Sequence, residues 1–331
     1  KVETQEYRIS FRVSILPVFD GEKIVMRLLP ENTKGYTLEE LGFWGVNLER
    51  IHHAIKRPTG IILATGPTGS GKTTTLYTLL EMLNTRGVNI STIEDPIEYR
   101  IPRINQTQVR PDIGFSFANG LRTLLRQDPN IIMVGEIRDN ETAALAINAA
   151  LTGHLVFSTL HTNSAAGALP RLLDMKIEPF LIASTVSAII SQRLVRRLCP
   201  ESEKHYLADA ELATLKKDID LDHIFQMLKK EKISGLESSL EKTPWYRPKK
   251  TSECPDGYKG RIGIHEVLTM SESVKELVMK NATSDEIERR AKEEGMLTML
   301  EEGFIRATQK TTSIKTWLSA SYERTAKNFH L

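Results

Sequence analysis

The stretch Gly66–Thr73 carries the clearest chemical signal in the sequence, because it fits the pattern G-x-x-x-x-G-K-[ST] without a mismatch. The apolar run 61–64 precedes it, and residues 74–84 follow it with leucines at helical spacing. A strand, a glycine-rich loop and a helix N-terminus in this order form a cradle of backbone N–H groups for phosphate. The predicted nucleotide-binding residues are Gly66, Pro67, Thr68, Gly69, Ser70, Gly71, Lys72, Thr73 and Thr74.

Two side chains of this loop have chemistry of their own. The ammonium group of Lys72 can reach the β- and γ-phosphates of a nucleotide, and the hydroxyl group of Thr73 can ligate Mg²⁺. The alternative, a chance match in a flexible loop, is disfavoured by the strand and helix patterns on either side. The loop therefore predicts a nucleotide site but does not say how the nucleotide is used.

Carboxylates follow two further apolar runs. Glu94, Asp95 and Glu98 come after the run 88–93, and Glu136 comes after the run 131–134. Carboxylates placed in this way can hold Mg²⁺ through water or orient a water molecule that attacks a phosphate. For residues 94–98 an acidic surface turn is the alternative.

Histidines bracket a fourth apolar run, 155–160, with His154 before it and His161 after it. A lone histidine is usually a hydrogen-bonded structural residue, but the position of His161 at a strand end predicts contact with the nucleotide. Three arginines surround the Glu136 segment in the sequence: Arg122, Arg126 and Arg138. They can form structural ion pairs or neutralise charge that develops during phosphoryl transfer.

The four apolar runs alternate with helix-like stretches, and this alternation predicts an α/β domain with a mostly parallel sheet. Chemistry in such a sheet gathers at the C-terminal ends of the strands, where the glycine-rich loop and the carboxylates fall. Two helices are expected late in this region. One covers 143–152 and stops at Gly153, and the other covers 179–197 and ends in basic residues.

The N-terminal segment alternates apolar and polar residues over 8–16 and 23–29, with a turn at 19–21, and this pattern predicts a β-hairpin. Two strands alone are marginally stable in water, so we expect further sheet from a part of this domain that precedes Lys1. Arg12 and Arg27 lie in the hairpin, where a solvated strand face is the simplest interpretation. Residues 31–58 read as a connector with helical content.

Composition sets limits on the function. The 331 residues are 40% hydrophobic and carry a net charge of +2, which allows about two packed domains and gives no argument for nucleic-acid binding. No apolar run approaches the roughly 18 residues that cross a bilayer, and no signal-like segment starts the chain, so we expect a cytoplasmic protein. Two cysteines, Cys199 and Cys254, make no disulfide framework.

Several stretches together resemble the ATPases of the type II secretion and type IV pilus assembly family, in the family's order and over essentially the whole chain. The matching stretches are 11–29, 65–75, 93–99, 127–139, 152–163 and 257–268. The resemblance implies that residues 1–30 are the C-terminal part of a truncated N-terminal α+β domain. A linker (31–58) and a RecA-like P-loop NTPase core (59–198) follow it. It also implies a zinc-type subdomain at 199–262 and a helical C-terminal subdomain at 263–331.

The function implied by the resemblance is ATP hydrolysis by a homohexamer. The ring would engage an inner-membrane platform protein at the inner face of the cytoplasmic membrane and power assembly of a pilus or a secretion pseudopilus. Lys72 and Thr73 would bind phosphate and Mg²⁺. The implied catalytic residues are Glu136, Glu94, Glu98, His161, His154, Arg12 and Arg27. The arginines implied in phosphate sensing or subunit contacts are Arg122, Arg126, Arg138 and Arg261.

The sequence departs from the family where two C-x-x-C pairs commonly bind structural zinc. It has Cys199 without a second cysteine three residues later, and only Cys254 near the second pair. Two thiolates cannot complete a tetrahedral site, so we expect no zinc unless Glu203, His205 or another residue substitutes.

The sequence disfavours two other functions. A RecA-type motor for DNA uptake or transfer is disfavoured by the near-neutral charge and the absence of a basic stripe. A module that binds ATP only as a structural switch is disfavoured because every acidic and histidine motif is intact.

Overall fold

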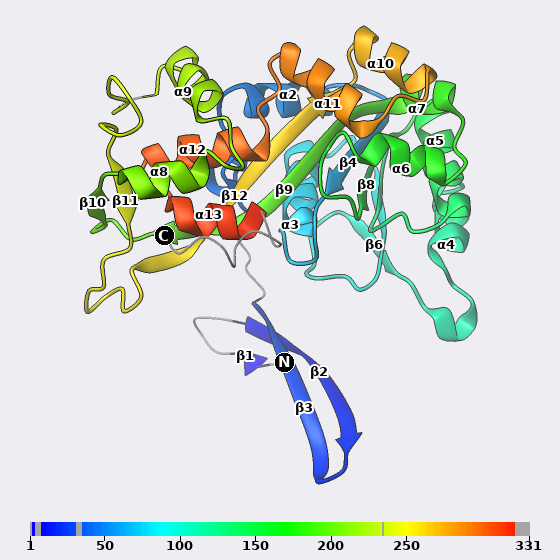
Figure 1. Cartoon of the computed structure of the whole chain (residues 1–331). Coiled ribbons are helices and arrows are strands. Elements are labelled where there is room, and N and C mark those ends of the chain that lie inside the picture. The colour runs from blue at the N-terminus through cyan, green and yellow to red at the C-terminus, as the bar shows by residue number, and fades with distance from the viewer. Residues whose placement is uncertain (1, 4–7, 31–34, 234, 322–331) are drawn as a thin grey trace.

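A seven-stranded sheet with helices on both faces forms the centre of the molecule (Figure 1). The computed structural model describes residues 2–3, 8–30, 35–233 and 235–321. The strand order is β12-β9-β4-β8-β7-β5-β6, and every neighbouring pair is parallel except β12 and β9. The strands are β4 (Gly60–Thr65), β5 (Ile90–Glu94), β6 (Asn105–Gln108), β7 (Ile131–Val134), β8 (Leu155–Leu160), β9 (Val186–Leu198) and β12 (Tyr258–Thr269). The predicted α/β fold and the four predicted strands are confirmed.

The sheet is buried on both faces, and this explains why its inner strands are almost continuously apolar. Every residue of β4, β5, β7 and β8 is buried. One face packs against α4 (Phe117–Leu124), α5 (Asn140–Leu151) and α7 (Pro179–Thr185). The other face packs against α2 (Gly45–Ile55) and α3 (Lys72–Leu83). Shorter elements connect these layers: α1 (Leu38–Leu41), the 3₁₀ turn η1 (Pro111–Ile113) and α6 (Ala168–Asp174).

The predicted helix over 179–197 is wrong beyond its first two turns. The helix α7 ends at Thr185, and the thirteen residues of β9 follow it directly. β9 pairs with β4 on one side and with β12 on the other. The segment Val186–Ile190 contains three β-branched residues, which suit a pleated sheet. Pairing on both edges therefore decides the conformation, and neither pairing is visible in the local sequence.

The edge strand β12 is covered by side chains instead of another strand. The backbone carbonyl group of His265 accepts a hydrogen bond from Asn47 Nδ2 at 3.0 Å, and its N–H group donates to Glu302 Oε2 at 2.9 Å. Arg50 Nη1 donates to the carbonyl group of Val267 at 2.8 Å. These contacts from α2 and α12 (Met299–Thr308) satisfy edge groups that would otherwise attract another strand. They also attach the connector helix α2 to the C-terminal region.

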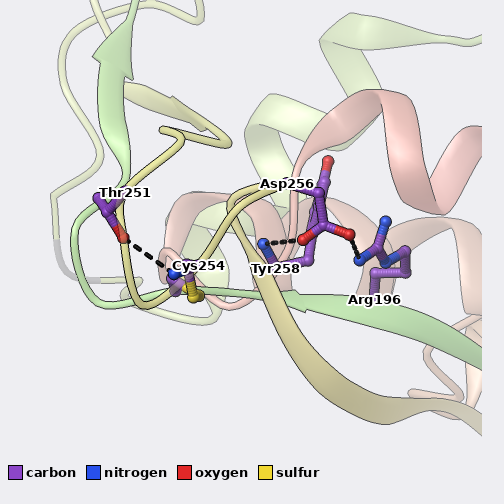
Figure 2. The surroundings of a disulfide bond; sticks show 6 residues. Arg196, Thr251, Cys254, Asp256 and Tyr258 are labelled. Atoms are coloured by element: carbon purple, nitrogen blue, oxygen red, sulfur yellow. Dashed lines mark hydrogen bonds and ion pairs between the residues drawn. A yellow bond between two sulfur atoms is a disulfide. The ribbon is translucent and has the colours of Figure 1, made fainter.

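Residues 199–257 form a small region that shares an apolar core with the C-terminal helices, in which Trp245 and Leu215 lie with Phe304 and Trp317. A two-stranded ribbon joins β10 (Glu203–His205) to β11 (Trp245–Arg247), and two helices, α8 (Asp209–Leu215) and α9 (Leu221–Lys230), lie between them in the sequence. A disulfide joins Cys199 to Cys254, which corrects the expectation that the two cysteines make no such link. Near it, the Cys254 N–H group donates to Thr251, and Asp256 accepts hydrogen bonds from Tyr258 and Arg196 (Figure 2).

The C-terminal part is helical, as predicted, over the residues that the structure describes. Its helices are α10 (Glu272–Met279), α11 (Ser284–Glu293), α12 and α13 (Ile314–Ser321). Thr283 forms a capping box with Glu286 at the start of α11. The expected helical subdomain extends to residue 331, and its part beyond residue 321 lies outside the described residues. Among the described residues, no helix is long and apolar enough to cross a membrane.

The predicted N-terminal hairpin is confirmed, with strands β2 (Arg8–Val18) and β3 (Gly21–Pro30) and a short third strand β1 (Val2–Glu3). Arg12 lies directly opposite Arg27 in the β2–β3 register. Figure 1 shows the hairpin apart from the central sheet, so this chain does not place these two positions beside its own glycine-rich loop.

Candidate functional site: a nucleotide site at the C-terminal ends of the strands

The glycine-rich loop connects the buried strand β4 to the N-terminus of α3. Gly66, Gly69 and Gly71 have φ angles of +135°, +80° and +92°, which side-chain-bearing residues rarely adopt. A Cβ atom on Gly66 would lie 2.4 Å from the carbonyl oxygen of Gln192 on β9. The loop therefore needs glycine at this position both for its backbone conformation and for its close approach to the neighbouring strand.

The loop presents the donors that a phosphate group requires. Lys72 Nζ donates to the carbonyl groups of Gly66 at 2.8 Å and of Pro67 at 3.1 Å, which folds the ammonium group over the loop. The hydroxyl group of Ser70 is buried without a hydrogen-bond partner among the described residues. The twelve-residue helix α3 adds its N-terminal amides and dipole. These groups fit a bound phosphate chain, whose oxygens accept hydrogen bonds from an ammonium group, a hydroxyl group and amides.

Glu136 follows β7, and its half-buried carboxylate contacts an arginine and a histidine. Oε1 lies 2.6 Å from Arg138 Nη2, and Oε2 lies 3.3 Å from Nε2 of His161, which follows the neighbouring strand β8. The charge of Glu136 also acts on Lys72, opposing the lowering of the Lys72 pKa by burial. The structure therefore brings Lys72, Glu136, Arg138 and His161 to one end of the sheet.

Backbone contacts hold the two strand ends of this group together. The Ile137 N–H group donates to the Thr159 carbonyl group at 3.0 Å, and the Thr159 hydroxyl group donates to the Gly135 carbonyl group at 2.8 Å. The residues that follow β7 thus continue to pair with β8 beyond Val134. This extension sets the separation between Glu136 and His161.

Glu94, at the end of β5, has a different environment. Its side chain is buried and accepts hydrogen bonds from the hydroxyl groups of Tyr77 and Thr92 and from Gln106 Nε2. Burial raises the pKa of Glu94, the three donors oppose that rise, and the charge of the half-buried Glu98 adds to it. Glu94 therefore connects α3 to β5 and β6, whereas Glu136 faces the glycine-rich loop.

Within the central domain, three of the predicted site residues lie away from this group. His154 precedes β8, and its Nδ1 atom contacts the Ala149 carbonyl group at 2.9 Å. It is separated from His161 by the length of the strand, about 20 Å at ~3.3 Å per residue. Arg122 forms an ion pair with Glu141 between α4 and α5, and Arg126 is exposed just after α4.

A pocket of about 310 Å³ opens beside the start of α3. One wall is the helix start, with Gly71 and Thr74, and another is β12, with Arg261 and His265. The connector residue Tyr36 lines it as well. The pocket adjoins the phosphate cradle, so a nucleoside can extend into it from phosphates held by the loop. Arg261 therefore lines a pocket beside the glycine-rich loop.

Residues without a motif also support the site. Gln192 Nε2 donates to the Ser70 carbonyl group at 2.8 Å, so a side chain of β9 holds the glycine-rich loop in place. Tyr77 and Gln106 hold Glu94 from α3 and β6. The one available signal was a polar Ser191-Gln192 pair interrupting an apolar run, and the incorrect helix prediction obscured it.

Comparison with known proteins identifies relatives of the whole described region. The family described as "Type II/IV secretion system protein" matches residues 1–319. The chain is 45% identical to a "Type II secretion system protein E" from Xanthomonas campestris pv. campestris, over 95% of this chain and 53% of that protein. It is 44% identical to a "Type IV pilus assembly ATPase PilB" from Myxococcus xanthus, over 93% of this chain and 52% of that protein.

A solved structure has the same fold. The crystal structure of "the Pilus Retraction Motor PilT and Bound ADP" has a TM-score of 0.65 and 27% identity, covering 93% of this chain and 73% of that one. The chain thus spans about half the length of the two sequence relatives and most of the solved neighbour. Because the family match covers 319 of 331 residues, this chain belongs to the type II/IV secretion system protein family.

Proposed function

We propose that this chain is the ATP-hydrolysing part of a motor that assembles a type IV pilus or a type II secretion pseudopilus. The observation that carries the proposal is the position of Glu136. Its carboxylate contacts Arg138 and His161, and its charge acts on Lys72 of the glycine-rich loop. An acid placed opposite a phosphate cradle can orient the water that attacks the γ-phosphate.

Each group has a role in this reaction. Lys72 leaves its carbonyl partners and binds the β- and γ-phosphates, while the loop amides and Ser70 hold the remaining oxygens. Mg²⁺ would neutralise phosphate charge, and the hydroxyl group of Thr73 would be the protein group that holds it. Glu136 orients the attacking water. His161 and Arg138 fix the direction of the carboxylate, and Glu94 and Glu98 support the neighbouring strand end.

The remaining arginines suit a ring of six copies. Arg12 and Arg27 lie on the hairpin, apart from the glycine-rich loop of the same chain. In a homohexamer they would reach a γ-phosphate when the N-terminal domain moves against the core. Arginines supplied in this way increase NTPase rates by ~10³–10⁵. Hydrolysis would then depend on the arrangement of domains, and this dependence couples the reaction to motion.

The partner in this proposal is an inner-membrane platform protein, which the ring engages from the cytoplasmic side. Support comes from the relatives' names, which refer to type II secretion and to type IV pilus assembly. A DNA-uptake or DNA-transfer motor is not favoured, because these relatives and the near-neutral charge point to secretion. DNA-stimulated hydrolysis that falls steeply with added salt would reverse this preference.

The test is ATP turnover and nucleotide binding by the full-length protein that contains this chain. Lys72→Ala should abolish nucleotide binding or turnover, and Glu136→Gln should bind ATP but scarcely hydrolyse it. Glu141→Gln, which removes an exposed carboxylate paired with Arg122, is the matched control and should behave as the wild type. Normal turnover by Glu136→Gln would contradict the proposed role of this residue.

A further inference from the structure

The carboxylate of Glu266, on β12, links two segments that are far apart in the sequence. Oε1 accepts a hydrogen bond from the Ala165 N–H group at 2.7 Å, and Oε2 accepts one from the Met299 N–H group at 3.3 Å. The residue is 3% exposed, and no ion pair is formed by it among the described residues. Burying a carboxylate without polar partners is energetically costly. Hydrogen bonds from these two amides offset the desolvation cost of the Glu266 carboxylate.

The first of these amides belongs to the loop that His161 begins. This loop is compact, because the Thr162 hydroxyl group donates to the Ser164 carbonyl group at 3.0 Å and the Gly167 N–H group donates to Ser164 Oγ at 3.1 Å. His161 lies four residues before Ala165. A displacement of the Ala165 amide is therefore transmitted through a short, internally bonded segment to the histidine that contacts Glu136.

The second amide opens the C-terminal helix α12. Met299 is its first residue, and Thr298 caps it together with Glu301. The same helix carries Glu302, which accepts hydrogen bonds from the edge of β12 and from Trp44 Nε1 of the connector. Glu266 thus joins the loop at the nucleotide site to a helix that holds the connector.

Glutamate suits this position for a chemical reason. A carboxyl group has acceptor lone pairs on both oxygens, so it can bind two backbone N–H groups at once. A glutamine side chain would turn a donor toward one of them. Glutamine can therefore keep the shorter contact to Ala165 and must lose the contact to Met299.

We propose that Glu266 is a positioning residue that fixes the loop carrying His161 against the start of α12. Its carboxylate holds the Ala165 and Met299 amides, and it acts by keeping His161 in contact with Glu136. This inference rests on the proposed ATPase function and adds to it a route by which the C-terminal helices affect hydrolysis. Loss of this anchor should slow the chemical step without weakening nucleotide binding, because the glycine-rich loop has its own support from Gln192.

The test compares three variants in the full-length protein by steady-state kinetics and by hydrogen exchange of the segment 161–167. Glu266→Ala should lower kcat by ~10–100-fold, the cost expected when a catalytic group is misplaced by about 1 Å, with KM for ATP unchanged. Glu266→Gln should lower kcat by a smaller factor. Glu288→Gln is the control, because it removes a charge that acts on Glu266 without touching the loop. Exchange in 161–167 should accelerate in Glu266→Ala and stay unchanged in the control.

The outcomes separate this inference from the proposed function. A wild-type kcat in Glu266→Ala would overturn the positioning role while leaving the ATPase proposal intact. A rise in KM as large as the fall in kcat would do the same. If Glu266→Ala does not fold, Glu266→Gln decides, assayed at a temperature at which it is folded: a lowered kcat with KM unchanged supports the role, and an unchanged kcat contradicts it. If the wild type does not hydrolyse ATP, the proposed function fails, and the exchange of the Ala165 segment alone supports or refutes the anchor.

Discussion

His161 Nε2 lies 3.3 Å from Glu136 Oε2, and this contact joins the ends of two adjacent parallel strands. The other oxygen of Glu136 contacts Arg138 at 2.6 Å. The carboxylate is thus held from two sides while its charge acts on Lys72 across the phosphate cradle. Residues separated by 64 positions in the sequence, Lys72 and Glu136, become parts of one site because β4, β8 and β7 are neighbours.

The two histidines that flank β8 should behave differently. His161→Ala removes a contact to Glu136, so we expect kcat for ATP hydrolysis to fall by ~10–100-fold, in the range of positioned catalytic groups. Binding of ATP should be unaffected. His154→Asn is the control, because the His154 ring contacts the Ala149 carbonyl group at the other end of the strand. Equal losses in the two variants would contradict the geometry described above.

The hydroxyl group of Tyr77 should contribute to stability through Glu94. Tyr77→Phe leaves the buried carboxylate without one of its donors, which costs about 1–3 kcal/mol in the free energy of unfolding. Urea unfolding of the purified protein measures this loss. Tyr99→Phe is a matched control, because Tyr99 packs edge-on against Tyr77 and its hydroxyl group makes no hydrogen bond among the described residues. A comparable loss in Tyr99→Phe would assign the effect to ring packing.

The disulfide should stabilise the region between β9 and β12. It closes a segment with a sequence separation of 55, and a link of this kind contributes roughly 2–4 kcal/mol by restricting the unfolded chain. We expect a reducing agent to lower the melting temperature of the wild type. The double variant Cys199→Ser/Cys254→Ser should already show the lower value and should not respond to the reducing agent. Nucleotide binding should be the same with and without the disulfide, because the glycine-rich loop lies elsewhere.

Glu266 should make stability depend on pH. The pKa of Glu266 is raised from 4.5 to about 7 in the folded protein, mainly because the side chain is buried. The negative charges of Glu288 and Glu301 raise it further by smaller amounts. The folded state therefore binds a proton that the unfolded state has released between these values, and stability falls as pH rises through this window. The loss is on the order of 3 kcal/mol between pH 4.5 and pH 7.

Comparison with Glu266→Gln isolates this contribution. Glutamine does not titrate. The free energy of unfolding of the wild type should therefore decrease relative to that of Glu266→Gln as the pH rises from 5 to 8. Glu302, also buried with a pKa raised to about 7, and His265, with a pKa lowered to about 3, titrate in both proteins and cancel in the difference. A pH-independent difference would show that Glu266 has the same pKa in the folded and unfolded states.

Local signals in the sequence were sufficient for the elements that carry their own patterns. The glycine-rich loop, the strands around it and the hairpin were predicted because glycine placement, buried apolar runs and strict alternation are encoded by neighbouring residues. The position of Glu136 after β7 was predicted for the same reason. The pattern over 179–197 failed because pairing with β4 and β12 outweighed a helix-like local sequence.

What the sequence determined by itself was the phosphate cradle, the carboxylate that follows β7 and the α/β alternation that places both at one edge of a sheet. Tertiary structure alone decided that His161 contacts Glu136 while His154 lies at the far end of the same strand. It also decided that Cys199 meets Cys254 and that Glu266 reaches Ala165 across 101 positions. The physical reason is that local patterns follow from backbone geometry within a few residues, whereas these contacts depend on strand order and packing, which only the folded chain fixes.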